Sequence, residues 1–506
     1  MKVSIIGGGI SGLTLGCYLQ MNGYETGIYE KNSQPGGLCA SWKRGEFTFD
    51  GCLHWLLGSG NSSSFYKLWS ELLDMKSIEF VHHEVRVSIE LKHNHNKYGD
   101  KIFRLYTNID RLEAYLLDLA PEDKNMIMSM VRFIRVMQKY EMPPLIEKIP
   151  QLQPLRKKMA MITYMPFLHQ MFKWKNVTNY SFARRLKNPF LKEAFELLYG
   201  GEEVSFFVIA MPLSFFDKKS AGYPVGGSAQ FAKRIADKYE SLGGKFHYRK
   251  EVKKIIVEND IAKGLLLNDG TNVYSDITIS TADWHFTLFK ALEGKYVNDS
   301  ILKLAALKKL EVYPSVMLVS LGVGRTFKEY PHFFRFPINN HYRSPDGTIY
   351  DWIEVHIYHY DPTLAPEGKT IIVMSFYTRN GEFWINLRNS DMETYDRNKE
   401  EFASSMINIL DEKLGGIKES IEETDVATPA TYHRYTGNWK GSAQGWFPAR
   451  KPGIPSSLNI NLPGLKGFYY TSQWSMPGGG LPVALKSSHD LTQKLCIKHK
   501  KKFRIR

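Results

Sequence analysis

Residues 1–31 decide the fold and read MKVSIIGGGISGLTLGCYLQMNGYETGIYEK. The apolar run Lys2–Ile6 predicts a strand, and the pattern from Ser11 to about Asn22 predicts an amphipathic helix that ends at Gly23. A second strand, Glu25–Tyr29, follows directly. This order of strand, helix and strand predicts the opening unit of a doubly wound α/β sheet.

The loop between the first strand and the helix carries the glycine spacing Gly7-x-Gly9-x-x-Gly12. In this setting Gly7 permits a tight turn, Gly9 lets a pyrophosphate approach the backbone, and Gly12 lets the helix pack closely on the strand. Glu30 follows Gly12 by 18 residues. Its carboxylate suits a ribose diol and would repel a 2′-phosphate, so FAD or NAD is favoured over NADP.

Two further glycine segments extend this pattern. Pro35-Gly36-Gly37 lies just beyond Glu30, where a second close approach to a diphosphate needs residues without a Cβ. Near the C-terminus, Pro477-Gly478-Gly479-Gly480-Leu481-Pro482 precedes a helix, and Pro482 suits the first turn of that helix. The N-terminus of this second helix would favour negative charge, although a capped helix without a ligand explains the segment equally well.

Composition sets outer limits on the protein class. The chain has 506 residues, 43% hydrophobic and 23% charged, which fits a folded protein with more than one core. The net charge of +14 points to an anionic partner. Four scattered cysteines without a CxxC pair exclude a disulfide framework and favour a reducing, intracellular compartment. No apolar stretch reaches the roughly 18–20 residues of a membrane-spanning helix.

The rest of the chain alternates between helical and strand patterns. Residues from about 110 to 200 read mostly as helix, whereas residues from about 310 to 380 alternate as in an antiparallel sheet. Gly226-Gly227-Ser228 opens a helix to about Leu242, and short strands follow it, separated at Asn259-Asp260 and at Asn268-Asp269-Gly270. A strand at Phe468–Thr471 comes before the last helix.

Several of these motifs together resemble those of a known protein family. The segments GGGISGL (7–13), FDGCLHWL (49–56), DPTLAPEGK (361–369) and GFYYTSQWSMPGGGLPVAL (467–485), with Glu30 and the Gly36-Gly37 pair, resemble the phytoene desaturase-like flavoproteins. These include carotenoid desaturases, carotenoid isomerases and retinol saturases. The resemblance runs from end to end and is weakest in the helical insert. One departure is Ser487-Ser488, where relatives usually have Ser-Gly, which leaves the packing of the last helix in question.

The resemblance implies a division of the chain. It implies a doubly wound FAD-binding domain built from discontinuous segments and a substrate domain of antiparallel sheet plus helical insert. The FAD-binding segments would be 1–75, 220–300 and 436–506, the last with a basic tail. The substrate domain would comprise 76–219 and 301–435.

The resemblance also implies site residues. Gly7, Gly9 and Gly12 would hold the pyrophosphate, Glu30 the adenosine ribose with Lys31 in the same site, and Gly36 and Gly37 the stretch nearer the flavin. The backbone of Val252 would hold the adenine. The residues bordering the isoalloxazine would be Trp474, Gly478, Gly479, Gly480 and Pro482.

The reacting groups are less distinct in the sequence. Flavin chemistry does not require a catalytic triad or paired carboxylates, and none stands out. His54 is placed near the flavin by the resemblance and is the one candidate for proton handling, with a purely structural histidine as the alternative. The pairs His356/His359 and His93/His95 follow no ligand pattern, so no metal site is predicted.

A basic segment indicates where the protein meets its surroundings. Residues 148–192 contain ten Lys or Arg and no Asp or Glu, interleaved with methionine and aromatic residues. This combination favours docking on an anionic bilayer, and a solvated basic face over a helical core is the alternative. Nucleic-acid binding would explain the charge but not the cofactor motifs. We therefore expect a cytoplasmic protein, peripheral on the membrane.

Together these features predict an FAD-dependent oxidoreductase that acts on C–C double bonds of an apolar polyene or isoprenoid substrate such as a carotenoid or retinoid. A single GxGxxG implies an external electron donor or acceptor, such as a quinone, oxygen or NAD(P)H. The alternatives are an amine-oxidase-like flavoenzyme and a non-catalytic relative that binds lipidated proteins. Substrate identity, direction of electron flow and oligomeric state stay open.

Overall fold

The computed structural model describes residues 1–93, 101–140, 163–308, 310–447, 458 and 462–505. Its first sheet is parallel and has the strand order β10-β2-β1-β14-β20. Its strands are β1 (Lys2–Ile6), β2 (Glu25–Tyr29), β10 (Lys245–His247), β14 (Ile277–Ser280) and β20 (Phe468–Tyr470). The chain leaves β1 in both directions across the sheet, which is the predicted doubly wound order, and three distant stretches of sequence contribute strands.

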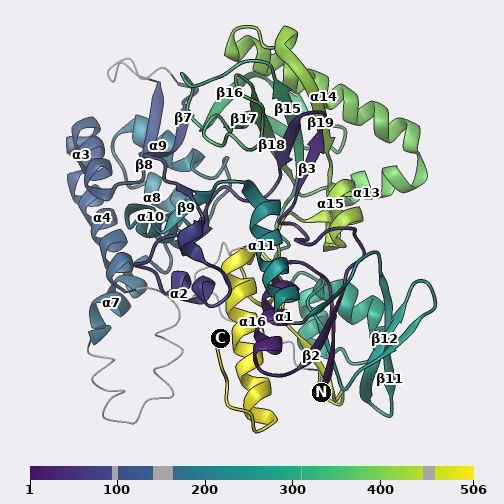
Figure 1. The fold of residues 1–506 in the computed structure, drawn as a ribbon. Coiled ribbons are helices and arrows are strands. Elements are labelled where there is room, and N and C mark those ends of the chain that lie inside the picture. Colours follow the sequence, from purple (N-terminus) through teal and green to yellow (C-terminus); the bar gives the residue numbers. More distant parts are fainter. Residues whose placement is uncertain (94–100, 141–162, 309, 448–457, 459–461, 506) are drawn as a thin grey trace.

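The two faces of this sheet are covered differently. Helices α1 (Ile10–Met21), α11 (Gly227–Ser241) and α16 (Gly480–Lys498) share one core with it. On the other face lie the antiparallel strands β11 (Val252–Glu258), β12 (Ile261–Leu267) and β13 (Asn272–Tyr274), which turn where the Asn, Asp and Gly clusters predict. In Figure 1, the purple α1 and the yellow α16 run side by side.

The expected amphipathic pattern of α1 is wrong. Every residue of this helix except Gln20 is buried, because β2, α11 and α16 all pack against it. A helix that is buried on all sides has no polar stripe. The predicted bounds of the helix are nevertheless within one residue of those observed.

The second sheet has seven strands in the order β19-β15-β18-β17-β16-β7-β8. All neighbouring pairs are antiparallel except β16 with β7, which are parallel. The antiparallel sheet expected for residues 310–380 is confirmed, whereas β7 and β8, the last two strands at one side of it, come from a part that was not predicted to join it. The strands are β7 (Val85–Glu90), β8 (Ile102–Tyr106), β15 (Ser315–Val323), β16 (Phe333–Arg343), β17 (Ile349–Ile357), β18 (Thr370–Thr378) and β19 (Ile421–Ala427).

Helices cover this sheet and extend it to one side. Helices α13 (Gly381–Ser390), α14 (Met392–Leu414) and α15 (Pro429–Thr436) pack with it. The helical part has its own aromatic core and contains α3 (Ile109–Leu119), α4 (Lys124–Lys139), α7 (Met165–Trp174), α8 (Asn179–Ala183), α9 (Pro189–Leu197) and α10 (Phe207–Asp217). This agrees with the predicted helical content. His95 and residues 148–162 of the basic segment lie outside the described residues.

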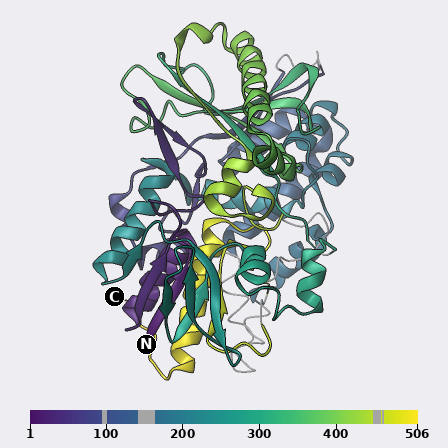
Figure 2. The same cartoon turned by 90° about the vertical axis from the view of Figure 1, so that its right-hand side faces the viewer.

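Short elements link the two sheets. They are β3 (Ser41–Arg44), β4 (Phe47–Asp50), β5 (Leu56–Leu57), β6 (Phe80–Val81), β9 (Ala221–Pro224), α2 (Ser64–Ser70) and α12 (Asp299–Ala305). Figure 2 shows the parallel sheet and both termini at one end of the molecule and the seven-stranded sheet at the other. In the part of the chain that the structure describes, no helix has both the length and the apolarity needed to cross a bilayer.

Candidate flavin and substrate site

The first part of the site is a glycine cradle at the N-terminus of α1. Gly9 caps this helix without any side-chain hydrogen bond, so the N–H groups of the first turn have no partner within the helix. A Cβ on Gly12 would lie 2.0 Å from the Gly7 carbonyl oxygen, which explains the glycine at that position. The Gly36 N–H donates to the Gly8 carbonyl at 2.9 Å and brings Gly37 against Gly9. The cradle fits a pyrophosphate.

Glu30 is fixed at the edge of this cradle. One carboxylate oxygen accepts the Gly8 N–H at 2.7 Å, and the other accepts the backbone and side-chain N–H groups of Asn32 at 2.8 Å each. Oε1 already accepts two hydrogen bonds, so the free lone pair for a ribose hydroxyl lies on Oε2. The Lys31 ammonium donates to the Arg434 carbonyl at 2.7 Å and so ties the end of β2 to α15.

The second part of the site is the N-terminus of α16. Gly478, Gly479 and Gly480 have φ values of +88°, +45° and +77°, a left-handed run that strongly favours glycine. Gly479 caps the helix without a side-chain hydrogen bond, and Pro482 lies in its first turn as predicted. Trp474 is buried, and its carbonyl accepts the Trp446 indole N–H at 3.1 Å.

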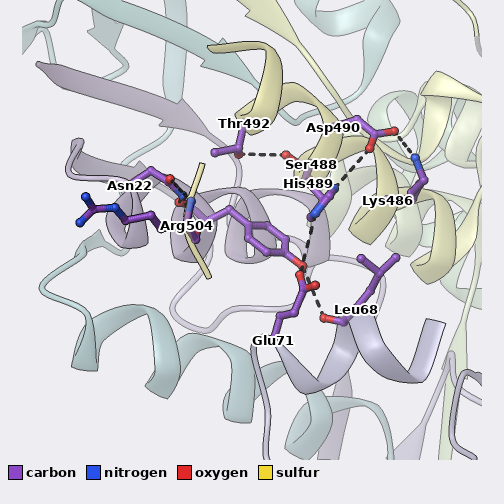
Figure 3. A network of polar contacts seen from close by, with 10 residues as sticks. Asn22, Leu68, Glu71, Lys486, Ser488, His489, Asp490, Thr492 and Arg504 are labelled. Carbon is purple, nitrogen blue, oxygen red and sulfur yellow. Dashed lines mark hydrogen bonds and ion pairs between the residues drawn. The ribbon is translucent and has the colours of Figure 1, made fainter. Parts of the chain in front are cut away.

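Direct contacts hold α16 against α1. The Ser488 hydroxyl donates to the Ser11 carbonyl in the first turn of α1 at 3.0 Å. Ser488 is completely buried, so the serine that replaces the usual glycine is accommodated by a hydrogen bond and the helices still pack closely. Figure 3 shows the surrounding network, in which His489 lies between Glu71 of the segment after α2 and Asp490 of α16.

Asp50 and Asp283 are buried carboxyl groups near the cradle. The Ser228 hydroxyl donates to Asp50 at 2.6 Å, which ties the segment before His54 to the N-terminus of α11. Asp283 follows β14 and accepts the N–H groups of Phe286 and Trp439 at 2.8 and 2.9 Å. Burial raises the pKa of Asp283 to about 7 despite these hydrogen bonds.

One cavity of about 1520 Å³ unites these parts. All but one of the predicted site residues line it, namely Gly7, Gly9, Glu30, Lys31, Gly36, Gly37, His54, Val252, Trp474, Gly478, Gly479, Gly480 and Pro482. Gly12 is the exception, because it lies behind the cradle, where it packs on Gly7. Beyond the glycine segments, the cavity continues into an apolar chamber walled by Met137, Met171, Phe207, Val208, Met211 and Phe216 of the helical part.

His54 lines the same cavity as the cradle and the chamber. Its ring stacks on His356 at a centroid distance of 4.0 Å, and His356 stacks on Phe333 at 4.1 Å. The His54 Nδ1 lies 3.3 Å from the Tyr358 hydroxyl. Burial, with the nearby His356 and Arg86, lowers the pKa of His54 well below its ordinary value. The imidazole is therefore neutral at physiological pH.

The sequence did not reveal the charged residues of the chamber. Arg86, Arg335, Glu354 and His356 line the cavity. Burial by itself would raise the pKa of Glu354, but the Arg335 guanidinium outweighs this effect and holds it well below its usual range. A signal was present in Trp352–Tyr358, because the strand alternation places Glu354 and His356 on one face.

Comparison with known proteins identifies the family of this chain. Residues 10–488 match the family model described as flavin containing amine oxidoreductase. Prolycopene isomerase 1, chloroplastic, of an Oncidium hybrid cultivar is 26% identical over 502 residues, which cover 94% of this chain and 80% of that protein. The phytoene desaturase of Fusarium fujikuroi is 23% identical, with 98% and 89% covered.

A solved structure supports the fold assignment. Putrescine oxidase with redesigned cofactor binding superposes with a TM-score of 0.56 at 14% identity, covering 98% of this chain and 99% of that one. At this identity the likeness concerns the fold. Because the family model spans most of the sequence and the glycine cradle fits its cofactor, this chain belongs to the flavin-containing amine oxidoreductases and is an FAD-dependent oxidoreductase.

Proposed function

We propose that the enzyme acts on C–C double bonds of an apolar polyene or isoprenoid substrate, such as a carotenoid or retinoid, by desaturation, saturation or cis–trans isomerisation. The observation that carries this proposal is the single cavity of about 1520 Å³ in which the glycine cradle continues into an apolar chamber. A cofactor in the cradle and a long apolar chain in the chamber would share one enclosed space.

Different residues of the site would bind different parts of FAD. The first turn of α1, with Gly7, Gly9, Gly36 and Gly37, would bind the pyrophosphate. Glu30 would bind the ribose hydroxyls, and the backbone of Val252 the adenine. The N-terminus of α16 at Gly478–Gly480, with Trp474, would lie beside the ring system. When bound, FAD supplies a ring nitrogen that accepts or donates hydride.

His54 is the residue we propose for proton handling. As a neutral imidazole it has one nitrogen that donates and one that accepts a proton, and the Tyr358 hydroxyl at 3.3 Å orients the ring. Burial raises the pKa of Tyr358, so its hydroxyl stays protonated. The pair can therefore relay a proton without carrying a charge into the apolar chamber.

The named relatives support a polyene substrate. Both the prolycopene isomerase and the phytoene desaturase carry polyenes in their names, and the alignments cover almost all of this chain. The cavity wall argues against the amine-oxidase-like alternative, because the Arg86 guanidinium faces the chamber without an ion pair in the described parts of the chain. An unpaired positive charge repels a cationic amine.

The proposal also includes an external electron partner and attachment of the protein to a membrane surface. We infer an external donor or acceptor, such as a quinone, oxygen or NAD(P)H. Helix α7 exposes Met165 and Phe172 by 58% and 68%, and Lys173 and Lys175 follow beside them. Apolar tips next to basic residues suit the surface of an anionic bilayer, from which an apolar substrate would be taken up.

Product analysis tests the proposal. The flavin-loaded protein would be incubated anaerobically with phytoene, prolycopene or retinol, once with oxidised and once with reduced flavin, and the products separated by chromatography. A more conjugated, a more saturated or an isomerised polyene supports the proposal and assigns the direction. Unchanged polyenes, together with turnover of a diamine such as putrescine, would overturn it.

A further inference from the structure

One partly buried cation of the chamber has no role in the function proposed above. Arg86 lies on β7 and faces the cavity. Its guanidinium carbon lies 5.5 Å from the ring centre of Phe216 and 5.1 Å from that of Phe333. Within the described parts of the chain, its guanidinium makes no hydrogen bond or ion pair. Two aromatic faces stabilise a cation but satisfy none of its five N–H donors.

The nearest carboxylate is already engaged. Glu354 accepts the Nε and Nη2 of Arg335 at 2.7 and 2.6 Å, and both side chains are nearly buried. A further nitrogen of Arg335 donates to the carbonyls of Leu197 and Leu198 at 3.1 and 2.6 Å. Arg335 and Glu354 thus form an ion pair in which both contacts fall on one carboxylate oxygen, Oε2.

The described groups around Arg86 leave its charge without a partner. Arg335 holds the Glu354 carboxylate, and burial lowers the pKa of His54 and His356 and keeps both neutral. Glu202 and Asp351 also line the cavity, but neither pairs with Arg86 in the described parts of the chain. A guanidinium without a partner in a largely apolar chamber is costly, so its free donors favour an anionic ligand there.

We propose that Arg86 binds the carboxylate end of a long apolar substrate. The inference rests on the proposed function and extends its substrates from hydrocarbon polyenes to amphipathic polyene acids. A planar guanidinium with free donors matches a carboxylate in a bidentate pair. From Arg86, the rings of Phe333, His356 and His54 form a continuous stack toward the cradle, and the apolar chain would lie along them.

Ligand binding tests this assignment. All-trans-retinoic acid and all-trans-retinol have the same polyene and differ in the terminal group, and palmitic acid has the carboxylate without the polyene. Their affinities for the flavin-loaded protein would be measured by quenching of tryptophan fluorescence. We expect the wild type to bind retinoic acid about 10- to 100-fold more tightly than retinol.

Variants of Arg86 distinguish the effect of its charge from the effect of its packing. Arg86→Met keeps the length of the side chain and should remove this preference with little change in retinol affinity, whereas Arg86→Lys should retain part of it. Arg111→Met removes an exposed arginine of α3 outside the cavity and should change neither affinity. Flavin content and thermal melting identify any variant that misfolds. If Arg86→Met misfolds, the comparison of the wild type with Arg86→Lys decides the role of Arg86.

This experiment distinguishes a failure of the role of Arg86 from a failure of the proposed function. Equal affinity of the wild type for retinoic acid and retinol, or an equal loss of both in Arg86→Met, would overturn the role of Arg86. If neither retinoid binds but palmitic acid binds in an Arg86-dependent way, the carboxylate site stands and the polyene substrate is wrong. If none of the three binds, both are wrong.

Discussion

Ser488 of α16 donates a hydrogen bond of 3.0 Å to the carbonyl oxygen of Ser11 in the first turn of α1. The two residues lie 477 positions apart and join the two helices whose N-termini line the same cavity. This bond fixes the position of one helix terminus relative to the other. A cofactor that contacts both termini depends on that spacing.

Removal of this bond should weaken both the fold and cofactor retention. Ser488→Ala leaves the buried Ser11 carbonyl with fewer partners and should lower the free energy of unfolding by about 1 kcal/mol. FAD should also dissociate faster. Thermal melting and flavin release measure the two effects. Ser487→Ala is the matched control, since the Ser487 hydroxyl bonds only within α16 among the described residues. Equal behaviour of the two variants would contradict this role of Ser488.

Gly9 offers a test of the cradle. A Cβ at this position would have no protein neighbour nearer than 3.8 Å, so Gly9→Ala should fold. Gly9→Leu should fold as well, but its side chain would fill the space for the pyrophosphate and lower the FAD affinity by at least about 100-fold. Fluorescence titration of the apoprotein gives both affinities. If Gly9→Leu remains fully loaded with FAD, the pyrophosphate lies elsewhere.

Asp283 should make stability depend on pH. Its pKa is about 7 in the folded protein, because burial raises it from 3.8. Between about pH 4 and pH 7 the folded state therefore holds a proton that the unfolded chain has lost. Stability falls as pH rises through this window, by up to about 1.4 kcal/mol per pH unit for one proton, and levels off above it.

Asp283→Asn isolates this effect. The variant loses the ionisable group. Its free energy of unfolding, relative to that of the wild type, should therefore rise from pH 4 to pH 7, and the difference should stay constant above pH 7. Urea denaturation at a series of pH values measures the difference. A difference that is constant across this range would show that Asp283 titrates with an ordinary pKa.

The surface of α7 should govern attachment to vesicles. Phe172 is 68% exposed, and the Lys175 ammonium lies 4.9 Å from the centre of its ring. Lys175→Gln should weaken binding to phosphatidylserine vesicles about fivefold, since a basic residue near an anionic surface contributes about 1 kcal/mol. Phe172→Ser should weaken it further.

Cosedimentation with vesicles compares these variants. Lys253→Gln removes the same charge from β11 and should leave binding unchanged. Equal binding of all three variants, or equal binding to neutral phosphatidylcholine vesicles, would show that α7 does not dock on an anionic membrane.

The cradle could be predicted from sequence because its signals are local. Gly7, Gly9, Gly12 and Glu30 lie within one strand, helix and strand unit, and the structure forms that unit as the spacing requires. The buried character of α1 could not be predicted, because α11 and α16, which cover it, come from distant parts of the chain.

The chamber could not be predicted for the same reason. Arg86 and Phe333 are neighbours only because β7 pairs with β16, where Ser88 lies opposite Phe334. A lone arginine in a short strand carries no local sign of such a partner. The alternation of Trp352–Tyr358 did place Glu354 and His356 on a common face, yet it could not show which face lines a cavity.

Whether a flavin and an apolar polyene meet in one cavity is measured most directly by an anaerobic titration. Flavin-loaded protein would be titrated with phytoene, which absorbs only in the ultraviolet, while the visible flavin band is recorded. We predict a saturable shift or bleaching of this band, because the cradle and the chamber are continuous. An unchanged flavin band, with phytoene shown by cosedimentation to be bound, would contradict a shared cavity, and so would a failure of phytoene to bind.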